Sequence, residues 1–347
     1  MAKRFTSKWR ESASLIILAK DKTNQDFLCD YKVLLFNRAQ KASFYPNSAV
    51  FPGGVHESSD ASPLWLDHIN SFRNTKDLNL FHCKKPRPNI FTNNIDQEIP
   101  RDISLRITAI RETFEETGIL LCLERNNKIT NSYGQIYENF DRRYWQYRVH
   151  NDHKQFLALC KELNVVPDLW SLHEWTAWLT PTTLTKRFET AFYVVAMEHM
   201  PEVLLESNEA ASFMWKTPVE FVTLYFSKYL FLPPPQLYEL SRLCHFTRLN
   251  ELLEFAQVRS QKGITLMLPV VQQCIDGRVN LMPGDDLYPS DPTQDSSSVE
   301  PINISIKQYR EMAKNLHRME FFNNNKVIIQ LNCSLADGHL PPVNIKQ

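Results

Sequence analysis

Two short segments of the sequence decide the fold: Phe51–Gly54, which reads FPGG, and Arg111–Ile119, which reads RETFEETGI. The second is typical of the C-terminal end of a helix, because Gly118 can take the left-handed conformation in which helices commonly end. We therefore predict a helix that begins with Asp102 or Ser104 as its N-cap and ends at Gly118. The paired glycines of the first segment predict a tight turn whose backbone can approach a ligand closely.

The predicted helix separates apolar from acidic side chains. At about 100° per residue its isoleucines and Phe114 share one face, which indicates packing against a sheet. Glu112, Glu115 and Glu116 share the opposite face, where they repel each other and where the helix dipole disfavours negative charge. A divalent cation would relieve both costs, and carboxylate oxygens favour Mg²⁺ or Mn²⁺ over zinc. The alternative is a solvated acidic face with Arg111 as a partial counter-ion, but the upstream FPGG turn favours the metal site.

Together the two segments resemble the signature of the nudix hydrolases, in which a glycine, a glutamate and an Arg-Glu-aliphatic-X-Glu-Glu-X-Gly-aliphatic group follow each other at fixed spacing. In this chain about 43 residues are inserted between Gly54 and Arg111. Counted from Gly54, the family's first glutamate would fall on Asp60; counted back from Arg111, it would fall on Ile103. Neither is a glutamate, so the chain follows the signature at its metal-binding end and departs from it at the entry to the helix.

Further segments resemble one branch of this family, the acyl-coenzyme A diphosphatases, in which such an insertion occurs. The resemblance covers roughly residues 12 to 290 and is carried by Val33–Arg38, Trp178–Pro181, Lys186–Phe192, Leu232–Gln236 and Met282–Tyr288. It implies Mg²⁺-dependent hydrolysis of the diphosphate bond of coenzyme A and acyl-coenzyme A, giving 3′,5′-ADP and (acyl-)4′-phosphopantetheine. Two alternatives stay open. One is a nudix pyrophosphatase acting on another nucleoside diphosphate derivative, such as a sugar nucleotide or capped RNA, and the other is a catalytically silent nudix protein that only binds its ligand.

The resemblance also implies roles for the residues of the two segments. Glu112, Glu115 and Glu116 would bind the metal ion, with the Gly53 carbonyl completing its coordination. Arg111 would orient the glutamates through an ion pair. Metal-activated water would then attack the diphosphate without a covalent intermediate.

Outside the helix, one acid and four basic residues are candidates for the site. Glu209 lies in a later loop, where the family commonly supplies a further acid, and we expect it to be an extra ligand or the catalytic base. The alternative is an exposed loop acid. Arg38, Lys41, Lys186 and Arg187 are the candidates for binding the phosphates of the substrate. Each could instead be a solvated charge at the edge of a strand.

Two features bear on the substrate. Ser43 and Asn47 stand where the coenzyme A branch has an arginine and a glycine, which keeps other diphosphates open as substrates. The insertion also carries large apolar residues that could cover an acyl or pantetheine arm but that we expect to pack the insertion onto the core: Trp65, Leu66, Phe72 and Phe81.

The sequence indicates a mixed α/β fold with a nudix α/β/α sandwich at residues 10–225. A long insertion, 56–101, lies inside the nudix signature and is rich in loop-forming residues, and a mostly helical C-terminal extension, 226–347, packs on the core. Residues 284–301 indicate a loop. Predicted strands are 12–19, 32–37, 175–180, 191–197 and 326–331, and predicted helices are 138–164, 218–231, 236–257 and 305–318.

The composition limits which other partners and compartments the sequence indicates. Lys+Arg and Asp+Glu both number 39, so no strong net charge indicates nucleic acid as a partner. No apolar run is long enough to predict a membrane span, and the seven unpatterned cysteines indicate free thiols. Family resemblance suggests the peroxisome, although the chain ends Val343–Gln347 without a Ser-Lys-Leu-like tripeptide. A mitochondrion or the cytoplasm is the alternative, and the sequence does not indicate an oligomeric state.

Overall fold

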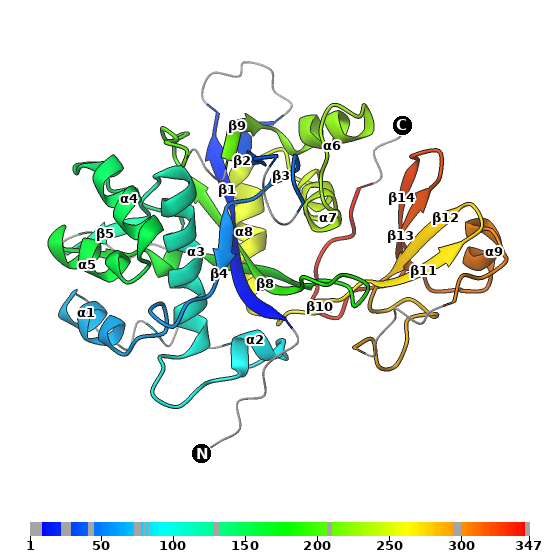
Figure 1. The fold of residues 1–347 in the computed structure, drawn as a ribbon, viewed down its shortest axis with the longest axis horizontal. Helices are drawn as coiled ribbons and strands as arrows, with labels where there is room; N and C mark the ends of the chain where they lie inside the picture. The colour runs from blue at the N-terminus through cyan, green and yellow to red at the C-terminus, as the bar shows by residue number, and fades with distance from the viewer. Residues whose placement is uncertain are drawn as a thin grey trace.

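The computed structural model describes residues 9–21, 29–40, 45–72, 78, 81, 83–125, 127, 132–206, 210–293 and 300–343. Its centre is an eight-stranded mixed sheet of order β10-β7-β8-β1-β2-β3, in which β4 also pairs with β1 and β9 with β2 (Figure 1). The central strand β1 is parallel to β8 and antiparallel to β2 and β4. The strands are β1 Arg10–Lys20, β2 Tyr31–Arg38, β3 Ala49–Val50, β4 Gly53–Val55, β7 His173–Leu179, β8 Phe188–Met197, β9 Ala210–Lys216 and β10 Leu266–Met267.

Helices cover both faces of this sheet, because the side chains of its buried strands alternate between two apolar clusters. Leu15 and Ile17 of β1 belong to the cluster that contains α3 (Arg101–Thr117), whereas Ile16 and Leu18 belong to the cluster on the other face. The helices of that other face are α6 Pro218–Phe226, α7 Pro234–Leu243 and α8 Leu249–Ser260. Figure 1 shows α3 and α8 on opposite sides of β1. The predicted α/β/α sandwich is confirmed.

The insertion packs beside α3 and is closed at its base, where the Ile99 N–H donates to the Ala61 carbonyl at 3.0 Å. It is less loop-rich than predicted, because its described residues include α1 (Leu64–Phe72) and α2 (Asn89–Thr92). Its large apolar residues enter the α3-side cluster, with Trp65 1% and Phe81 7% exposed and with Leu66 and Phe72 packed against it. The expectation that these residues fix the insertion to the core is confirmed.

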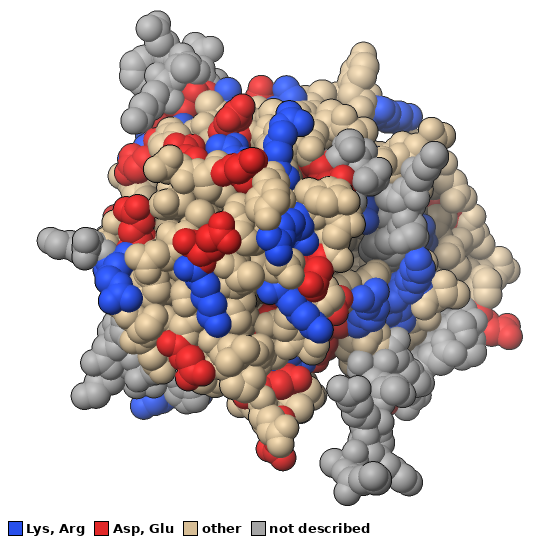
Figure 2. Space-filling model, turned by 60° about the vertical axis from the view of Figure 1, so that its left-hand side comes forward, with Lys and Arg blue, Asp and Glu red and all other residues tan. Residues whose placement is uncertain are grey.

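The region after α3 adds a small layer around the same cluster. The predicted helix over 138–164 is two helices, α4 Arg142–Asn151 and α5 Gln155–Glu162, and the neighbouring elements are β5 Cys122–Glu124, β6 Val165–Pro167 and the 3-10 turn η2 Leu169–Ser171. Figure 2 looks at the molecule from this side and shows acidic and basic side chains interspersed over the surface, as expected from the balanced composition.

The C-terminal extension is only partly helical, which corrects the sequence prediction. Helices α7 and α8 belong to the sandwich, but the chain then forms a four-stranded antiparallel sheet of order β11-β12-β13-β14 beside the short helix α9. The predicted helix over 305–318 ends at Glu311, and β13 begins at His317. The elements are β11 Val270–Cys274, β12 Gly277–Leu281, α9 Ile306–Glu311, β13 His317–Phe322 and β14 Val327–Leu331.

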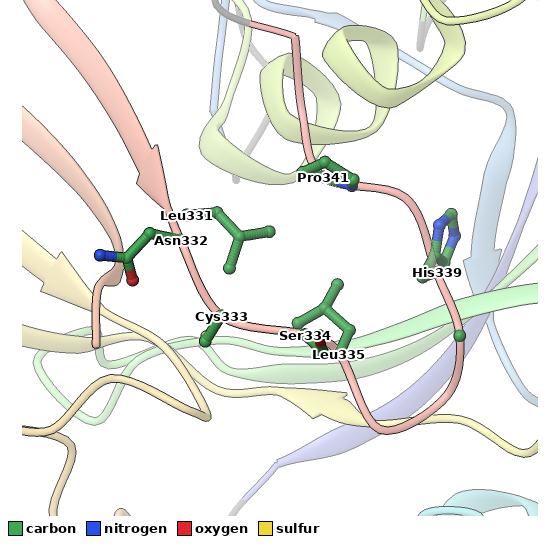
Figure 3. Close-up of a pocket in the computed structure, with 8 residues that line it drawn as sticks. Leu331, Asn332, Cys333, Ser334, Leu335, His339 and Pro341 are labelled. Carbon is green, nitrogen blue, oxygen red and sulfur yellow. The ribbon is translucent and has the colours of Figure 1, made fainter.

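After β14 the chain returns to the sandwich, and the Val343 N–H donates to the Ser241 carbonyl of α7 at 3.0 Å. This returning segment lines a cavity of about 410 Å³ together with the end of β14 (Figure 3). The lining runs from Leu331 to Pro341, so it does not include any residue that the sequence assigned to chemistry. The cavity therefore lies outside the candidate site.

Candidate metal centre and active site

Helix α3 carries the predicted acids at its C-terminal end. Gly118 closes the helix with φ of 69° and donates its N–H to the Phe114 carbonyl, as the sequence predicted. The other end differs from the prediction, because Pro100 precedes the helix and no side chain caps it. The carboxylate of Asp102 instead accepts a hydrogen bond from Arg87 of the insertion, Nη2 to Oδ2 at 3.2 Å. The N-cap predicted at Asp102 or Ser104 is therefore wrong.

The FPGG turn lies directly against the acidic face of α3. The Gly53 N–H donates to Oε2 of Glu116 at 2.8 Å. Gly53 has φ of 151°, and a Cβ there would lie 2.4 Å from the carbonyl oxygen of Ala13 in β1. A Cβ on Gly54 would lie 2.4 Å from Oε2 of Glu112. Gly53 is therefore required for the turn to approach the sheet this closely, whereas a side chain at Gly54 would displace the carboxylate of Glu112.

Arg111 is buried and binds carboxylates on two sides. Its Nη1 donates to Oε1 of Glu112 at 3.0 Å and to Oε1 of Glu115 at 2.6 Å. Its Nε and Nη2 donate to the two carboxylate oxygens of Asp60, each at 2.8 Å. Nη2 also donates to the Val55 carbonyl at 2.8 Å. Arg111 therefore orients two of the three glutamates while the other side of its guanidinium is held in place.

Asp60 is the residue whose importance the sequence did not reveal. It is 1% exposed and also accepts hydrogen bonds from Thr108 Oγ1 at 2.8 Å and from the Glu57 N–H at 3.1 Å. Its place in the sequence is where the nudix signature puts its first glutamate, counted from Gly54. Counting six residues from Gly54 therefore finds this position, but the residue there is an aspartate and does not match the glutamate of the signature.

The charges of this cluster suit a hard divalent cation. Asp60, Glu112, Glu115 and Glu116 bring four carboxyl groups to the region where Arg111 supplies one guanidinium. The pKa of Glu115 is raised to about 8, mainly because the carboxyl group is buried. The nearby charge of Arg111 partly offsets this rise in pKa, and the charge of Glu112 adds to it. A buried carboxyl group with a raised pKa is stabilised in its charged form by a nearby cation.

The carboxyl groups of this cluster do not converge on a single point in the described structure. In the part of the chain that the structure describes, no group of three or more His, Cys, Asp or Glu side chains is arranged to hold a metal ion. Glu112 and Glu115 turn toward Arg111, whereas Glu116 turns toward Gly53. The three glutamates nevertheless lie within about one and a half turns of the same helix.

A loop segment and α4 fix the end of the acidic helix. The Leu204 N–H donates to the Thr117 carbonyl at 2.8 Å, and the Glu206 N–H donates to the Glu116 carbonyl at 3.3 Å. Gln146 of α4 donates its Nε2 to the carbonyl oxygens of Glu115 and Leu204, at 2.9 and 2.8 Å. Glu209, the predicted extra acid, lies outside the described residues, three positions beyond this segment.

The described candidates for phosphate binding lie in two segments, at the end of β2 and just before β8, and no described contact joins Arg38 to Lys186 or Arg187. Arg38 is the last residue of β2, and its Nε is buried with no hydrogen-bond partner among the described residues. Lys41 lies outside those residues. Lys186 is exposed, and Arg187 donates Nε to the Thr180 carbonyl at 2.9 Å.

Arg187 lies near the opposite end of α3 from the glutamates. The Arg10 N–H donates to its carbonyl at 3.0 Å, and the next residue in β1, Glu11, pairs with Arg101 in the first turn of α3. At about 1.5 Å per residue, Arg101 and Glu116 are roughly 22 Å apart along the helix. The structure therefore brings Arg111 and the glutamates together, but no described contact joins Lys186 or Arg187 to them.

Comparisons with known proteins agree with this geometry. The family model described as the NUDT19 Nudix domain matches residues 9–243, and the one described as the NUDT19 C-terminal domain matches residues 272–332. The acyl-coenzyme A diphosphatase NUDT19 of Xenopus laevis is 36% identical, over 97% of this chain and 96% of its own length. The protein of the same name from Homo sapiens is 31% identical over 97% of this chain and 96% of its own length.

Among solved structures, a NUDIX hydrolase from Alicyclobacillus acidocaldarius superimposes with a TM-score of 0.53 at 22% identity, covering 71% of this chain and 96% of its own. At that identity the likeness concerns the fold. A search of the described helices for an apolar span long enough to cross a bilayer finds none.

Proposed function

The chain belongs to the NUDT19 family of Nudix hydrolases, and from this premise we propose that it hydrolyses the diphosphate bond of coenzyme A and acyl-coenzyme A. The products are 3′,5′-ADP and (acyl-)4′-phosphopantetheine. Relatives of nearly full length carry the name acyl-coenzyme A diphosphatase. The observation that carries the proposal is the set of buried and half-buried carboxylates that Arg111 and the FPGG turn hold at the end of α3.

The proposed metal ligands are Glu112, Glu115 and Glu116, with the Gly53 carbonyl, and the proposed ion is Mg²⁺ or Mn²⁺. When bound, such an ion neutralises the diphosphate and lowers the pKa of a coordinated water. The carboxylate donors support this assignment, because hard oxygen ligands suit these cations. The contact between the Gly53 N–H and Oε2 of Glu116, at 2.8 Å, supports it too, because it places the FPGG turn beside this carboxylate.

The remaining site residues orient the proposed metal ligands or accept the proton of the attacking water. Arg111 orients Glu112 and Glu115, and Asp60 in turn orients Arg111. Proton acceptance from the attacking water is assigned to an acid of the set Glu115, Glu116 and Glu209. No covalent intermediate is needed, because the water attacks phosphorus directly.

Arg38 and Lys41 are proposed to bind substrate phosphate from the end of β2, since the buried Nε of Arg38 has no described partner. Lys186 and Arg187 could only meet a distal part of an extended substrate, such as a 3′-phosphate. The proposed hydrolase domain is residues 10–225, and the proposed extension, 226–347, packs on it and supplies α7 and α8 to one face of the sheet. The peroxisome is the compartment proposed from family resemblance.

The proposal is tested by a chromatographic assay of product formation from coenzyme A, an acyl-coenzyme A, ADP-ribose and a dinucleotide. Each substrate is incubated with Mg²⁺, with EDTA, and with the Glu116→Gln variant. Glu254→Gln is the matched control, because this glutamate is exposed on α8 in the opposite layer. Release of 3′,5′-ADP from coenzyme A that requires both Mg²⁺ and Glu116 supports the proposal. Cleavage confined to ADP-ribose or the dinucleotide would replace the substrate, and no metal-dependent product at all would favour a binding protein.

A further inference from the structure

An apolar row crosses the sheet just beyond the end of α3. Phe213 of β9 pairs with Phe36 of β2, and Phe36 pairs with Val50 of β3. The carbonyl of Phe231 accepts a hydrogen bond from the Ala49 N–H at 2.9 Å, on the outer side of β3. We call Phe213, Phe36, Val50 and Phe231 the apolar row. With adjacent strands about 4.8 Å apart, it spans roughly 14 Å.

The three strand residues of the row, Phe213, Phe36 and Val50, lie on the face that α3 covers, as the strand alternation requires. Leu34 belongs to the α3-side cluster, and Phe36, two residues further along β2, points the same way. Trp215 packs against that same cluster, and Phe213 lies two residues before it in β9. Phe231 lies in a segment without helix or strand, and the centre of its ring is 6.3 Å from that of Tyr45.

The row begins beside the acids. Leu205 packs on Phe36 and Val50, and its neighbours Leu204 and Glu206 donate their N–H groups to the last two residues of α3. Val50 precedes Gly53 by three residues, which places the two within about 11 Å of each other even in a fully extended chain. The apolar row is therefore continuous with the cluster of carboxylates.

The two ends of the row are open to solvent. Phe36 and Val50 are 1% and 7% exposed, whereas Phe213 and Phe231 are 40% and 48% exposed. Helix α3 does not extend over them, because Gly118 ends it. The two exposed rings therefore flank a buried pair that Leu205 covers, and exposed apolar side chains beside a reaction site are typical of a ligand surface.

We infer that this row binds the acyl chain of the substrate, which lies over the exposed rings of Phe213 and Phe231. The inference rests on the proposed function and extends it. The four side chains of the row are hydrocarbons without donors or acceptors. A nucleobase edge placed against them would leave its polar groups unpaired, whereas a hydrocarbon chain would lose no hydrogen bond.

The test compares kcat/KM for coenzyme A and for acyl-coenzyme A substrates of increasing chain length. Full burial of one methylene corresponds to about a fourfold gain, and burial of half its surface to about twofold. In the wild type, kcat/KM should rise with chain length. In the double variant Phe213→Thr/Phe231→Thr, kcat/KM for the acyl-coenzyme A with the longest chain should be at least about tenfold lower than in the wild type. The value of kcat/KM for coenzyme A should stay within twofold of the wild type.

Tyr229→Thr is the matched control, since Tyr229 is 83% exposed in the same loop as Phe231 and is not part of the row. The thermal midpoint of each variant is measured alongside. An unchanged dependence on chain length in the double variant would overturn the inference. An equal loss for coenzyme A and acyl-coenzyme A, with weaker inhibition by 3′,5′-ADP, would overturn it in favour of an adenine site. A wild type that cleaves neither substrate would refute the proposed function itself.

Discussion

The contact between Asp60 and Arg111 gives the sharpest test of how the site is held. Asp60→Asn keeps the volume of the side chain, but it removes its charge and turns an amide N–H₂ toward a guanidinium. In the wild type, the Asp60 carboxylate accepts two hydrogen bonds of 2.8 Å from Arg111 and one of 2.8 Å from Thr108. All three side chains are buried, so water cannot replace the lost acceptor.

The substitution Asp60→Asn should lower both the free energy of unfolding and the affinity for metal. Removal of one partner of a buried ion pair costs about 3–5 kcal/mol in the free energy of unfolding. The freed Arg111 N–H groups would turn to Glu112 and Glu115, which already accept from its Nη1. Since those carboxylates are proposed to bind the metal, we expect the metal affinity to fall about 10- to 100-fold, as is usual when a residue that orients ligands is lost.

Urea unfolding and metal titration followed by calorimetry measure the two effects separately. Thr108→Val is the control, because it removes one hydrogen bond to Asp60 without changing charge and should cost about 1 kcal/mol. Asp60→Glu restores the charge but adds a methylene to a buried site, which should cost about 1–3 kcal/mol of stability and preserve more metal affinity than asparagine does. If Asp60→Asn leaves both the unfolding midpoint and the metal affinity at wild-type values, the positioning argument is wrong.

Three further predictions concern single residues. Gly54→Ala should weaken metal binding and activity with less than about 1 kcal/mol lost in urea unfolding, because the new methyl group meets only the flexible carboxylate of Glu112. Stability should fall by up to about 3 kcal/mol between pH 6.5 and pH 4 through His317, since burial lowers its folded-state pKa to about 4 and only the unfolded chain takes up the proton. His317→Gln should therefore reduce the slope of the pH–stability curve over that range. Arg87→Ala should cost about 1–3 kcal/mol in urea unfolding, because the buried carboxylate of Glu174 loses its partner at 3.0 Å and keeps only the weaker contact with Arg106 at 3.5 Å.

The sequence predicted the centre of the fold because its signals are local there. The alternation in β1 and β2 and the periodicity of α3 are set by burial against immediate neighbours, and Gly118 ends the helix by its own conformation. The acidic face of α3 was predictable for the same reason. Its orientation by Arg111 was also expected, and the ion pairs to Glu112 and Glu115 are consistent with it.

The C-terminal sheet was not predictable because tertiary contacts decide it. The strand β13 buries three ionisable residues, His317, Arg318 and Glu320, which local reasoning treats as exposed and helix-compatible. His317 and Arg318 have partners distant in sequence, and Glu320 pairs with Arg310 of α9. Arg318 pairs with Asp285 at 2.5 Å, and the buried ring of His317 lies within hydrogen-bond distance of the hydroxyl of Tyr238, at 2.7 Å. These partners come from other elements, so no window of the sequence contains the signal.

The insertion separates Asp60 from Arg111 along the chain without separating them in space. Its base is closed by the hydrogen bond between Ile99 and Ala61, immediately after Asp60. Lengthening a closed loop from about seven to about 50 residues costs only about 1.7 kcal/mol of closure entropy, because the cost grows with the logarithm of length. Trp65 alone, buried at 1% exposure, offsets a cost of this size, since burying a large apolar side chain contributes about 1.5–3 kcal/mol. The signature can therefore be interrupted in sequence and remain continuous in structure, provided that the residues on both sides of the break still meet. The two sides of the break meet in the 2.8 Å hydrogen bonds between Asp60 and Arg111. Removal of these bonds should therefore affect both the stability of the fold and the affinity for metal.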